Sequence, residues 1–283
     1  MEIPHNTKPR PDTGLYNGKL GLWLFLASEV MLFGGLFSAY VLLRTGALAW
    51  PKGELSLGLG TLNTIILVSS SVLVMTGYTA LKLKQFDRFR FYHAATILLA
   101  VVFLGIKSVE WVSKFKHYEI WLTDAGVQEL ESKHTDSYAW LKPATIIPGK
   151  RSITGHIEGN PWLLSHRKFK QAGITEIVVH PDIHDGESKG HPAPLRIPVS
   201  HIHRMTAYVP AHSSYFALYF TITGLHALHV LGGLIVLGYL GGPGLKMWHS
   251  DPERFTNRIE LSVVYWHFVD FIWLIVFPLF YLL

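Results

Sequence analysis

The sequence predicts an all-α integral membrane protein, a bundle of five transmembrane helices with a loop-rich outer insertion between the third and fourth helices. Two observations carry this prediction. Hydrophobic residues make up 49% of the 283 residues, and charged residues only 16%. The apolar residues are also gathered into five runs, each close to the length of about 20 residues that a helix needs to cross a bilayer. These runs are residues 20–43, 57–81, 91–112, 215–240 and 261–283.

The first run is expected to remain as a helix, because it contains Glu29 and no small-residue cleavage pattern of a signal peptide follows it. It also contains Gly34, Gly35, Ser38 and Ala39. Small residues spaced four apart let helices approach closely. We expect ordinary packing within the bundle for this span, and likewise for the second run, which is rich in Ser, Thr and Gly.

A polar segment, residues 113–210, separates residues 1–112 with the first three spans from residues 211–283 with the last two. Ten of the 16 histidines of the chain fall between His117 and His212, nine of them within this segment. Its apolar content is thin for an independent core, and only "GITEIVVHPDI", residues 173–183, has the composition of a strand. We therefore expect a loop-rich excursion or very small domain that leans on a neighbouring protein.

The basic residues of the short connections predict the orientation, because such residues mark the cytoplasmic side. The N-terminal arm, the second connection and the last connection carry Lys8, Arg10, Lys19, Lys82, Lys84, Arg88, Arg90, Lys246, Arg254 and Arg258. This places the N-terminus in the cytoplasm, and the C-terminus and residues 113–210 on the outer side.

The absence of cysteine from the sequence excludes disulfides, thiolate-bound clusters and the covalent attachment of a c-type haem. Haem or metal bound by histidine is not excluded.

Ionisable residues within a membrane span are costly and usually face protein, water or one another. Glu29 lies near mid-depth of the first span, where it is either a proton-related carboxyl or an acid hydrogen-bonded to a nearby serine or backbone carbonyl. Lys107 and Glu110 are three residues apart near the outer end of the third span, so they share a helix face and can form an ion pair.

The same three-residue spacing occurs in both of the last two spans. His226 and His229 lie in the fourth span, and His267 and Asp270 lie in the fifth. We interpret them as one polar seam between adjacent helices. A metal or bis-histidine haem site is the alternative, but neither span has the Glu-x-x-His pair of bundle di-iron sites.

Histidines of the outer segment also have spacings that a metal would accept. The two pairs are His180 with His184 and His201 with His203. Without cysteine nearby, this spacing is a weak indication of a metal site. We expect solvated or interface histidines instead.

Five stretches, in this order, resemble one known family: "LFLASEVMLFGGLFSAY", "LNTIILVSSSVLV", "GIKSVEW", "GLHALHVLGG" and "YWHFVDFIWL". The chain is similar to subunit III of the haem-copper terminal oxidases, above all cytochrome c oxidase. The resemblance covers all five spans, while residues 113–210 find no counterpart in it.

The resemblance implies a subunit without redox centres that packs against the haem- and copper-bearing subunit I, beside subunit II and other respiratory subunits in a bacterial inner membrane. It implies support of proton uptake by subunit I, and bound phospholipid. Glu29 matches the carbodiimide-reactive carboxyl of the family. None of Glu110, His226, His229, His267 and Asp270, which match the intramembrane polar set of the family, is expected to bind a metal.

Two departures from the family qualify these expectations. The first span here resembles the third helix of the seven-helix mitochondrial members, as in the five-helix bacterial members. Where family members often place an arginine for a lipid phosphate, only Lys246 is present. Subunit III of a quinol oxidase, an accessory subunit of a nitric oxide reductase, and a His-ligated membrane metalloenzyme stay as alternatives. A transporter would need broken helices and inverted repeats, which the sequence does not show.

Overall fold

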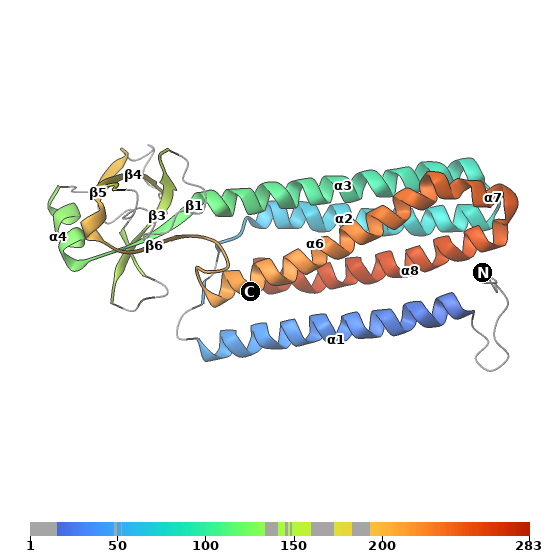
Figure 1. Ribbon diagram of the computed structural model, residues 1–283, viewed down its shortest axis with the longest axis horizontal. Helices are drawn as coiled ribbons and strands as arrows, with labels where there is room; N and C mark the ends of the chain where they lie inside the picture. Colours follow the sequence, from blue (N-terminus) through green and yellow to red (C-terminus); the bar gives the residue numbers. More distant parts are fainter. Residues whose placement is uncertain are drawn as a thin grey trace. The chain divides into compact units, whose positions relative to one another are not determined.

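Five long helices form the membrane part of the chain, as predicted. A computed structural model describes residues 16–47, 50–51, 53–133, 141–144, 147, 149–159, 173–182 and 193–283. Each of the five helices is long and apolar enough to cross a bilayer. They are α1 (Asn17–Gly46), α2 (Leu57–Lys82), α3 (Phe86–Lys116), α6 (Ser214–Gly241) and α8 (Pro252–Phe277), the last continued by η4 (Pro278–Leu282) (Figure 1).

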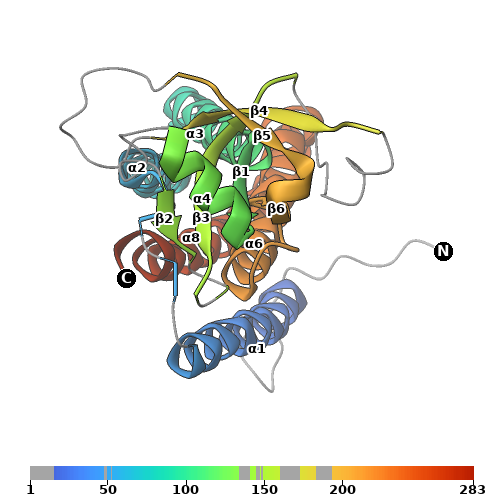
Figure 2. The ribbon, with the colours of Figure 1, turned by 90° about the vertical axis from the view of Figure 1, so that its left-hand side faces the viewer.

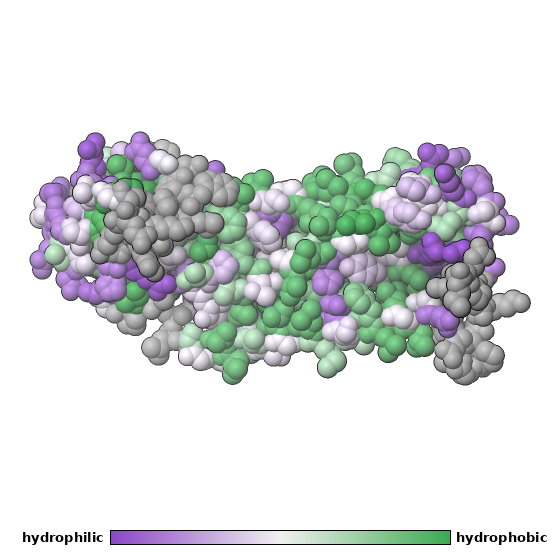
Figure 3. Space-filling model, viewed as in Figure 1, coloured by the Kyte–Doolittle hydropathy of each residue, from purple (hydrophilic) through white to green (hydrophobic). Residues whose placement is uncertain are grey.

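The chain divides into two compact units. The first contains residues 1–42, 52–107 and 221–283, and the second contains residues 43–51 and 108–220. Most of each long helix therefore belongs to the first unit, which is described first. On the face of the helices that Figure 3 shows, apolar side chains predominate, as expected of surfaces that meet lipid or other membrane chains.

Helices α2 and α8 pack closely along a face of α2 that carries both apolar and polar residues. The buried positions of α2 include Asn63, Leu67, Ser70 and Val74, which recur every three or four residues and so lie on one face. Two tryptophans of α8 lie against this face, and their indole N–H groups donate to hydroxyls of α2. The bonds run from Trp266 to Ser70 and from Trp273 to Thr64, each at 3.0 Å.

Helix α1 lies at the edge of the bundle (Figures 1 and 2). Only 11% of its apolar 18-residue stretch is buried. It is held beside α8 by the ion pair of Lys19 with Glu260, at 2.6 Å, and by a hydrogen bond from the Tyr40 hydroxyl to the Leu279 carbonyl, at 2.8 Å. The small residues of α1 do not pack as predicted. A Cβ atom added at Gly34 or Gly35 would meet nothing within 4 Å, because this face points away from the rest of the bundle.

The connections from α2 to α3 and from α6 to α8 are short. The α2–α3 turn occupies residues 83–85, and its Lys84 has a φ of 59°. Between α6 and α8 lie η3 (Pro243–Leu245) and α7 (Lys246–Ser250). Asp251 caps α8 by accepting a hydrogen bond from the Arg254 backbone N–H at 3.0 Å.

The second unit contains an antiparallel sheet of six strands in the order β5-β4-β3-β1-β6, with β2 paired to β3 (Figure 2). The strands are β1 (His117–Leu122), β2 (Leu141–Pro143), β3 (Arg151–Ile157), β4 (Glu176–Pro181), β5 (Leu195–Pro198) and β6 (Ile202–Ala207). Helix α4 (Asp124–Lys133) follows β1, and the 3₁₀ turn η2 (Val199–His201) precedes β6.

This sheet has a hydrophobic core of its own, which corrects the expectation of a thin core and a single strand. Alternate residues of the strands, such as Ile120, Ile153 and Val179, are fully buried on one face, and Leu130 of α4 packs against them. Strand β4 falls within the segment in which a strand was predicted. The other strands were missed because several have only three to six residues, too few to show a clear alternation.

Candidate functional site

The polar side chains inside the helical bundle form the candidate site. Glu29 of α1 meets His229 of α6: the carboxylate Oε2 and the imidazole Nε2 are 3.0 Å apart. Both side chains are mostly buried, with exposed fractions of 14% and 15%. The hydroxyl of Ser28 instead donates to the Phe25 carbonyl at 2.6 Å. Glu29 therefore has a histidine as its partner, and Ser28 is not used for this purpose.

The second nitrogen of His229 fixes how this pair shares protons. Its Nδ1 lies 2.7 Å from the carbonyl of Leu225. A carbonyl only accepts, so Nδ1 carries a hydrogen. Nε2 and the Glu29 carboxyl are then joined by a single hydrogen, which resides either on the carboxyl or on the imidazole. The pair can thus exchange one proton between a carboxyl and an imidazole.

An apolar cavity of about 360 Å³ lies next to this pair. Phe25, one turn before Glu29, lines it together with Gly232, one turn after His229. Tyr265 of α8 also lines it and donates a hydrogen bond to the His229 carbonyl at 2.9 Å. The cavity is apolar enough to hold a hydrocarbon chain about one helical turn from Glu29 and His229.

The remaining predicted seam residues do not pair directly between α6 and α8. Nδ1 of His267 lies 2.6 Å from the hydroxyl of Ser71 on α2. The hydrogen bonds of the predicted seam therefore run from α6 to α1 and from α8 to α2. Three-residue spacing places two side chains on one helix face, but it does not say which neighbour that face meets.

Three buried side chains of the first unit each leave both of their polar atoms without a hydrogen-bond partner among the described residues. Both ring nitrogens of His226, both amide atoms of Asn63 and both carboxylate oxygens of Asp270 lack one that meets the usual geometry. The His226 ring lies between Phe103 and Trp273, with ring centroids 5.8 and 5.1 Å away. Sequence reasoning missed Asn63, although an amide within an apolar run was a usable signal.

Lys107 and Glu110 each have a tyrosine partner. In the first unit, Nζ of Lys107 donates to the Tyr281 hydroxyl at 2.7 Å and lies 5.2 Å from the centre of the Trp273 ring. In the second unit, Glu110 accepts a hydrogen bond from the Tyr219 hydroxyl at 2.7 Å. The ion pair between Lys107 and Glu110 stays a prediction.

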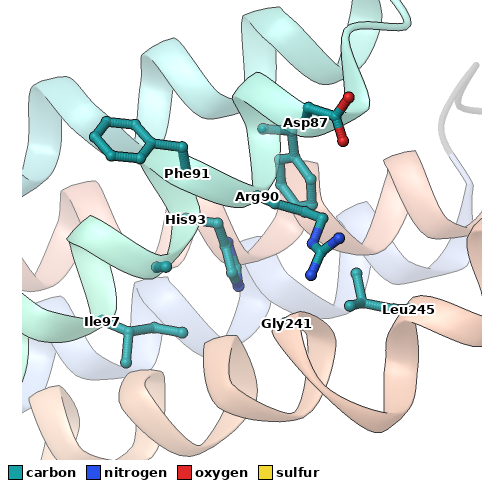
Figure 4. A pocket seen from close by; sticks show the side chains of 9 residues that line it. Asp87, Arg90, Phe91, His93, Ile97, Gly241 and Leu245 are labelled. Carbon is teal, nitrogen blue, oxygen red and sulfur yellow. The ribbon is translucent and has the colours of Figure 1, made fainter.

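A second cavity, of about 340 Å³, lies beside the end of α6. Arg90 and His93 extend into it from α3, towards Gly241 and Leu245 (Figure 4). The His93 ring is fixed, because its Nε2 donates to the Leu237 carbonyl at 2.9 Å. Arg90 is exposed, and its side chain makes no hydrogen bond or ion pair within the described part of the chain. Its guanidinium is thus free to bind an anion.

Lys246, the predicted lipid contact, begins α7 and is exposed. It follows Leu245, which lines the second cavity.

The histidines singled out in the outer segment have carboxylate neighbours or lie outside the described residues. Nε2 of His180 is 3.9 Å from Glu158, and Nδ1 of His201 is 2.7 Å from Glu129. His203 is exposed, and His184 lies outside the described residues. His180 and His201 thus each lie beside a carboxylate.

Comparison with known proteins gives one consistent result. A family model described as "Cytochrome c oxidase subunit III" matches residues 12–118 and 200–283, which include all five long helices. It leaves residues 119–199, most of the sheet, unmatched.

The similarity to individual relatives covers more of the chain than the family model does. Cytochrome c oxidase subunit 3 of Thermostichus vulcanus is 26% identical over 93% of this chain and 86% of that protein. The subunit of the same name from Synechocystis sp. is 23% identical over 99% of this chain and 79% of that protein. A "Heme-copper oxidase subunit I+III" of Aeropyrum pernix is 22% identical over 92% of this chain, which spans 22% of that longer protein.

Proposed function

Because the chain belongs to the cytochrome c oxidase subunit III family, we propose that it packs directly against subunit I of its oxidase and supports proton uptake there without carrying haem or copper itself. It is subunit III of a haem-copper terminal oxidase, a component of an oxygen-reducing membrane complex. The observation that carries this conclusion is the family match over every one of the five long helices.

The exposed face of α1 is the surface that we assign to subunit I. Met31 is 79% exposed and Leu42 72% exposed, and between them lie the unpacked Gly34, Gly35 and Ser38. Small residues flanked by large apolar ones suit close contact with another membrane helix. The name of the Aeropyrum pernix relative, "Heme-copper oxidase subunit I+III", describes the two subunits as one protein. This agrees with direct contact between subunits I and III.

Cross-linking tests this contact, and the absence of cysteine from the chain makes single introduced thiols unique. We expect Met31→Cys to cross-link to subunit I through a short bifunctional reagent. Leu98→Cys is the matched control, because Leu98 is 62% exposed on α3, across the bundle from α1. Equal yields from both positions, or none from Met31→Cys, would refute the assignment.

For proton uptake we propose a role of the Glu29–His229 pair, which joins a carboxyl and an imidazole by one hydrogen. Glu29→Gln should leave assembly and initial turnover largely intact, alter proton-coupled behaviour and abolish labelling by a hydrophobic carbodiimide. Glu253→Gln, at an exposed position in the first turn of α8, should leave the labelling unchanged. Undiminished labelling of Glu29→Gln would exclude Glu29 as the target.

We also propose a phospholipid at the cavity of Arg90, with its phosphate on the guanidinium and its chains along Phe91 and Ile97. Lys246 is close enough in sequence to Leu245 to add a second positive charge. Native mass spectrometry should detect less bound phospholipid in the Arg90→Gln complex. Arg88→Gln is the control, because Arg88 binds Gln85 at 3.0 Å and does not line the cavity. Equal lipid content in the two variants would reject this site.

The relatives named as subunit 3 of cytochrome c oxidase favour that enzyme over a quinol oxidase or a nitric oxide reductase. For location we propose a bacterial inner membrane with a cytoplasmic N-terminus. In support, the α2–α3 turn and α7, which carry basic residues, lie at the same end of the first unit. Accessibility of thiols introduced at Lys84 and at His203 to an impermeant reagent would test this orientation.

A further inference from the structure

The register of the sheet aligns three histidines across three neighbouring strands. His117 of β1 is opposite His156 of β3, and His156 is opposite His180 of β4. Directly opposed residues of an antiparallel sheet point to the same face. These histidines therefore share one face, which is opposite to the face that bears the buried apolar residues Ile153 and Val179.

Asp182 joins this row at the end of β4. It is two residues after His180, and its backbone N–H donates to the Thr154 carbonyl at 2.9 Å. Its Oδ2 lies 2.9 Å from Nε2 of His117. The rings of His117 and His156 have centroids 5.0 Å apart and are nearly perpendicular, at 82°. Ligand atoms of His117, His156 and Asp182 all lie within 4.8 Å of one another.

We infer that His117, His156 and Asp182 together bind one divalent cation of the Zn²⁺ class, with water as a fourth ligand. Two imidazoles and a carboxylate are a donor set that Zn²⁺ accepts in tetrahedral geometry. Mg²⁺ and Ca²⁺ prefer oxygen donors alone and should not compete. The ion would tie β1, β3 and the end of β4 together.

The neighbours of the two histidines orient them as metal ligands usually are. Nδ1 of His156 donates to the carbonyl of Lys116 at 3.1 Å, which leaves the Nε2 lone pair free. The His117 ring stacks on Tyr208, with centroids 4.9 Å apart, and the Tyr208 backbone N–H donates to the His117 carbonyl. The cation takes the place of the hydrogen between His117 and Asp182, and the neutral His117 ring then carries its proton on Nδ1.

The site is accessible to solvent, and its ligand atoms need to move only a short distance to reach the spacing of a tetrahedral zinc site. The side chains of His117 and Asp182 are 19% and 32% exposed, and His156 is exposed. Tetrahedral ligands of Zn²⁺ lie roughly 3.3 Å apart. The His117–Asp182 pair is already near this spacing, so the exposed His156 ring supplies most of the movement.

This site lies apart from the oxidase function proposed above. His156 and Asp182 are among residues 119–199, which the family model does not match. The inference therefore stands or falls independently of the subunit I contact and of Glu29.

Titration of the purified full-length chain with ZnCl₂, after treatment with a chelator, tests the inference. We expect one Zn²⁺ per chain, and a loss of affinity of about tenfold or more in both His156→Gln and Asp182→Asn. Asp182→His, which creates a three-histidine set, should keep the binding. His203→Gln is the matched control, because His203 is an exposed histidine of β6 outside the cluster and should bind Zn²⁺ as the wild type does.

Circular dichroism and size-exclusion profiles of the variants should match the wild type, which excludes unfolding as the cause of a loss. Co²⁺ should substitute for Zn²⁺ and give the visible absorption of a tetrahedral site, while excess Mg²⁺ should displace neither ion. The absence of stoichiometric Zn²⁺, or equal affinity in the His156→Gln, Asp182→Asn and His203→Gln chains, would overturn the inference and leave His117 and Asp182 as a plain hydrogen-bonded pair.

Discussion

Nε2 of His229 and Oε2 of Glu29 lie 3.0 Å apart, and this contact joins α6 to α1 at a point where both side chains are mostly buried. Helix α1 has little buried surface elsewhere. The pair is therefore expected to matter both for holding α1 and for the chemistry of the carboxyl. The contribution to stability can be measured separately, because either Glu29 or His229 can be replaced to remove the hydrogen bond.

A double-mutant cycle measures the coupling of this pair. We expect Glu29→Leu and His229→Leu each to destabilise the chain, because each leaves a mostly buried polar group without its partner. Hydrogen bonds between membrane helices couple by about 0.6 kcal/mol, and at most by about 1.7 kcal/mol. Unfolding in mixed micelles should give a coupling energy within that range.

The control cycle combines Glu29→Leu with His267→Leu, since His267 bonds Ser71 and makes no hydrogen bond to Glu29. Those two changes should be additive within about 0.5 kcal/mol. Additive effects in the Glu29–His229 cycle as well would show that the pair contributes no net stability.

Two glycines of α6 give a test of helix packing. A Cβ atom at Gly233 would lie 2.9 Å from the Trp266 ring, which is fully buried and bonded to Ser70. Gly233→Ala should therefore force α6 and α8 apart and cost about 1–3 kcal/mol. Gly238 has nothing within 4 Å, so Gly238→Ala should be neutral or stabilise the helix by up to about 1 kcal/mol. Similar unfolding free energies for both variants would disprove this close packing.

The five helices could be predicted because each is a run of apolar residues long enough to be recognised by itself. Glu29 and His229 could be found for the same reason, since polar residues stand out in such runs. That they are partners could not be predicted, because the pairing depends on how α1 and α6 are rotated about their axes. Asn63 was overlooked, although the apolar run around it gave the same signal.

The sheet was hard to predict for a different reason. Its core is assembled from alternate residues of short strands. Strands β1 and β6 pair although 79 residues lie between Leu122 and Ile202 in the sequence. Each strand by itself contributes only one to three residues to this core. The row formed by His117, His156 and His180 follows from the register, which no local pattern in the sequence specifies.

A hydroxyl of α2 gives a test of the tryptophan contacts. The Trp273 indole N–H donates to Oγ1 of Thr64 at 3.0 Å. Thr64→Val keeps the shape of the side chain but leaves the buried N–H unpaired, so we expect a loss of about 1–2 kcal/mol in unfolding free energy. Thr61, one turn away, is exposed and bonds only its own helix at Leu57. Thr61→Val should change stability by less than about 0.5 kcal/mol, and an equal loss in both variants would contradict the role of Thr64.

The last prediction concerns pH and the docking of α4. Glu129 accepts a hydrogen bond from Lys133 and lies 2.7 Å from Nδ1 of His201 in η2. The hydrogen bond from Lys133 holds the pKa of Glu129 below its ordinary value of 4.5. The charges of Lys133 and His201 act in the same direction, and desolvation opposes them. A lowered pKa in the folded state stabilises the fold above the unfolded-state pKa, and the effect is lost as the pH falls through the folded-state pKa.

Hydrogen exchange of the α4 amides in the full-length chain should therefore show two regimes. Near neutral pH, Glu129→Gln should exchange faster than the wild type, because the ionised carboxylate holds α4 to His201. The difference should shrink below a pH of about 4 and vanish once the wild-type carboxyl is protonated. Glu131→Gln, at an exposed position of the same helix, should exchange like the wild type throughout. A difference between Glu129→Gln and the wild type that persisted at low pH would show that the carboxylate charge does not hold α4 in place.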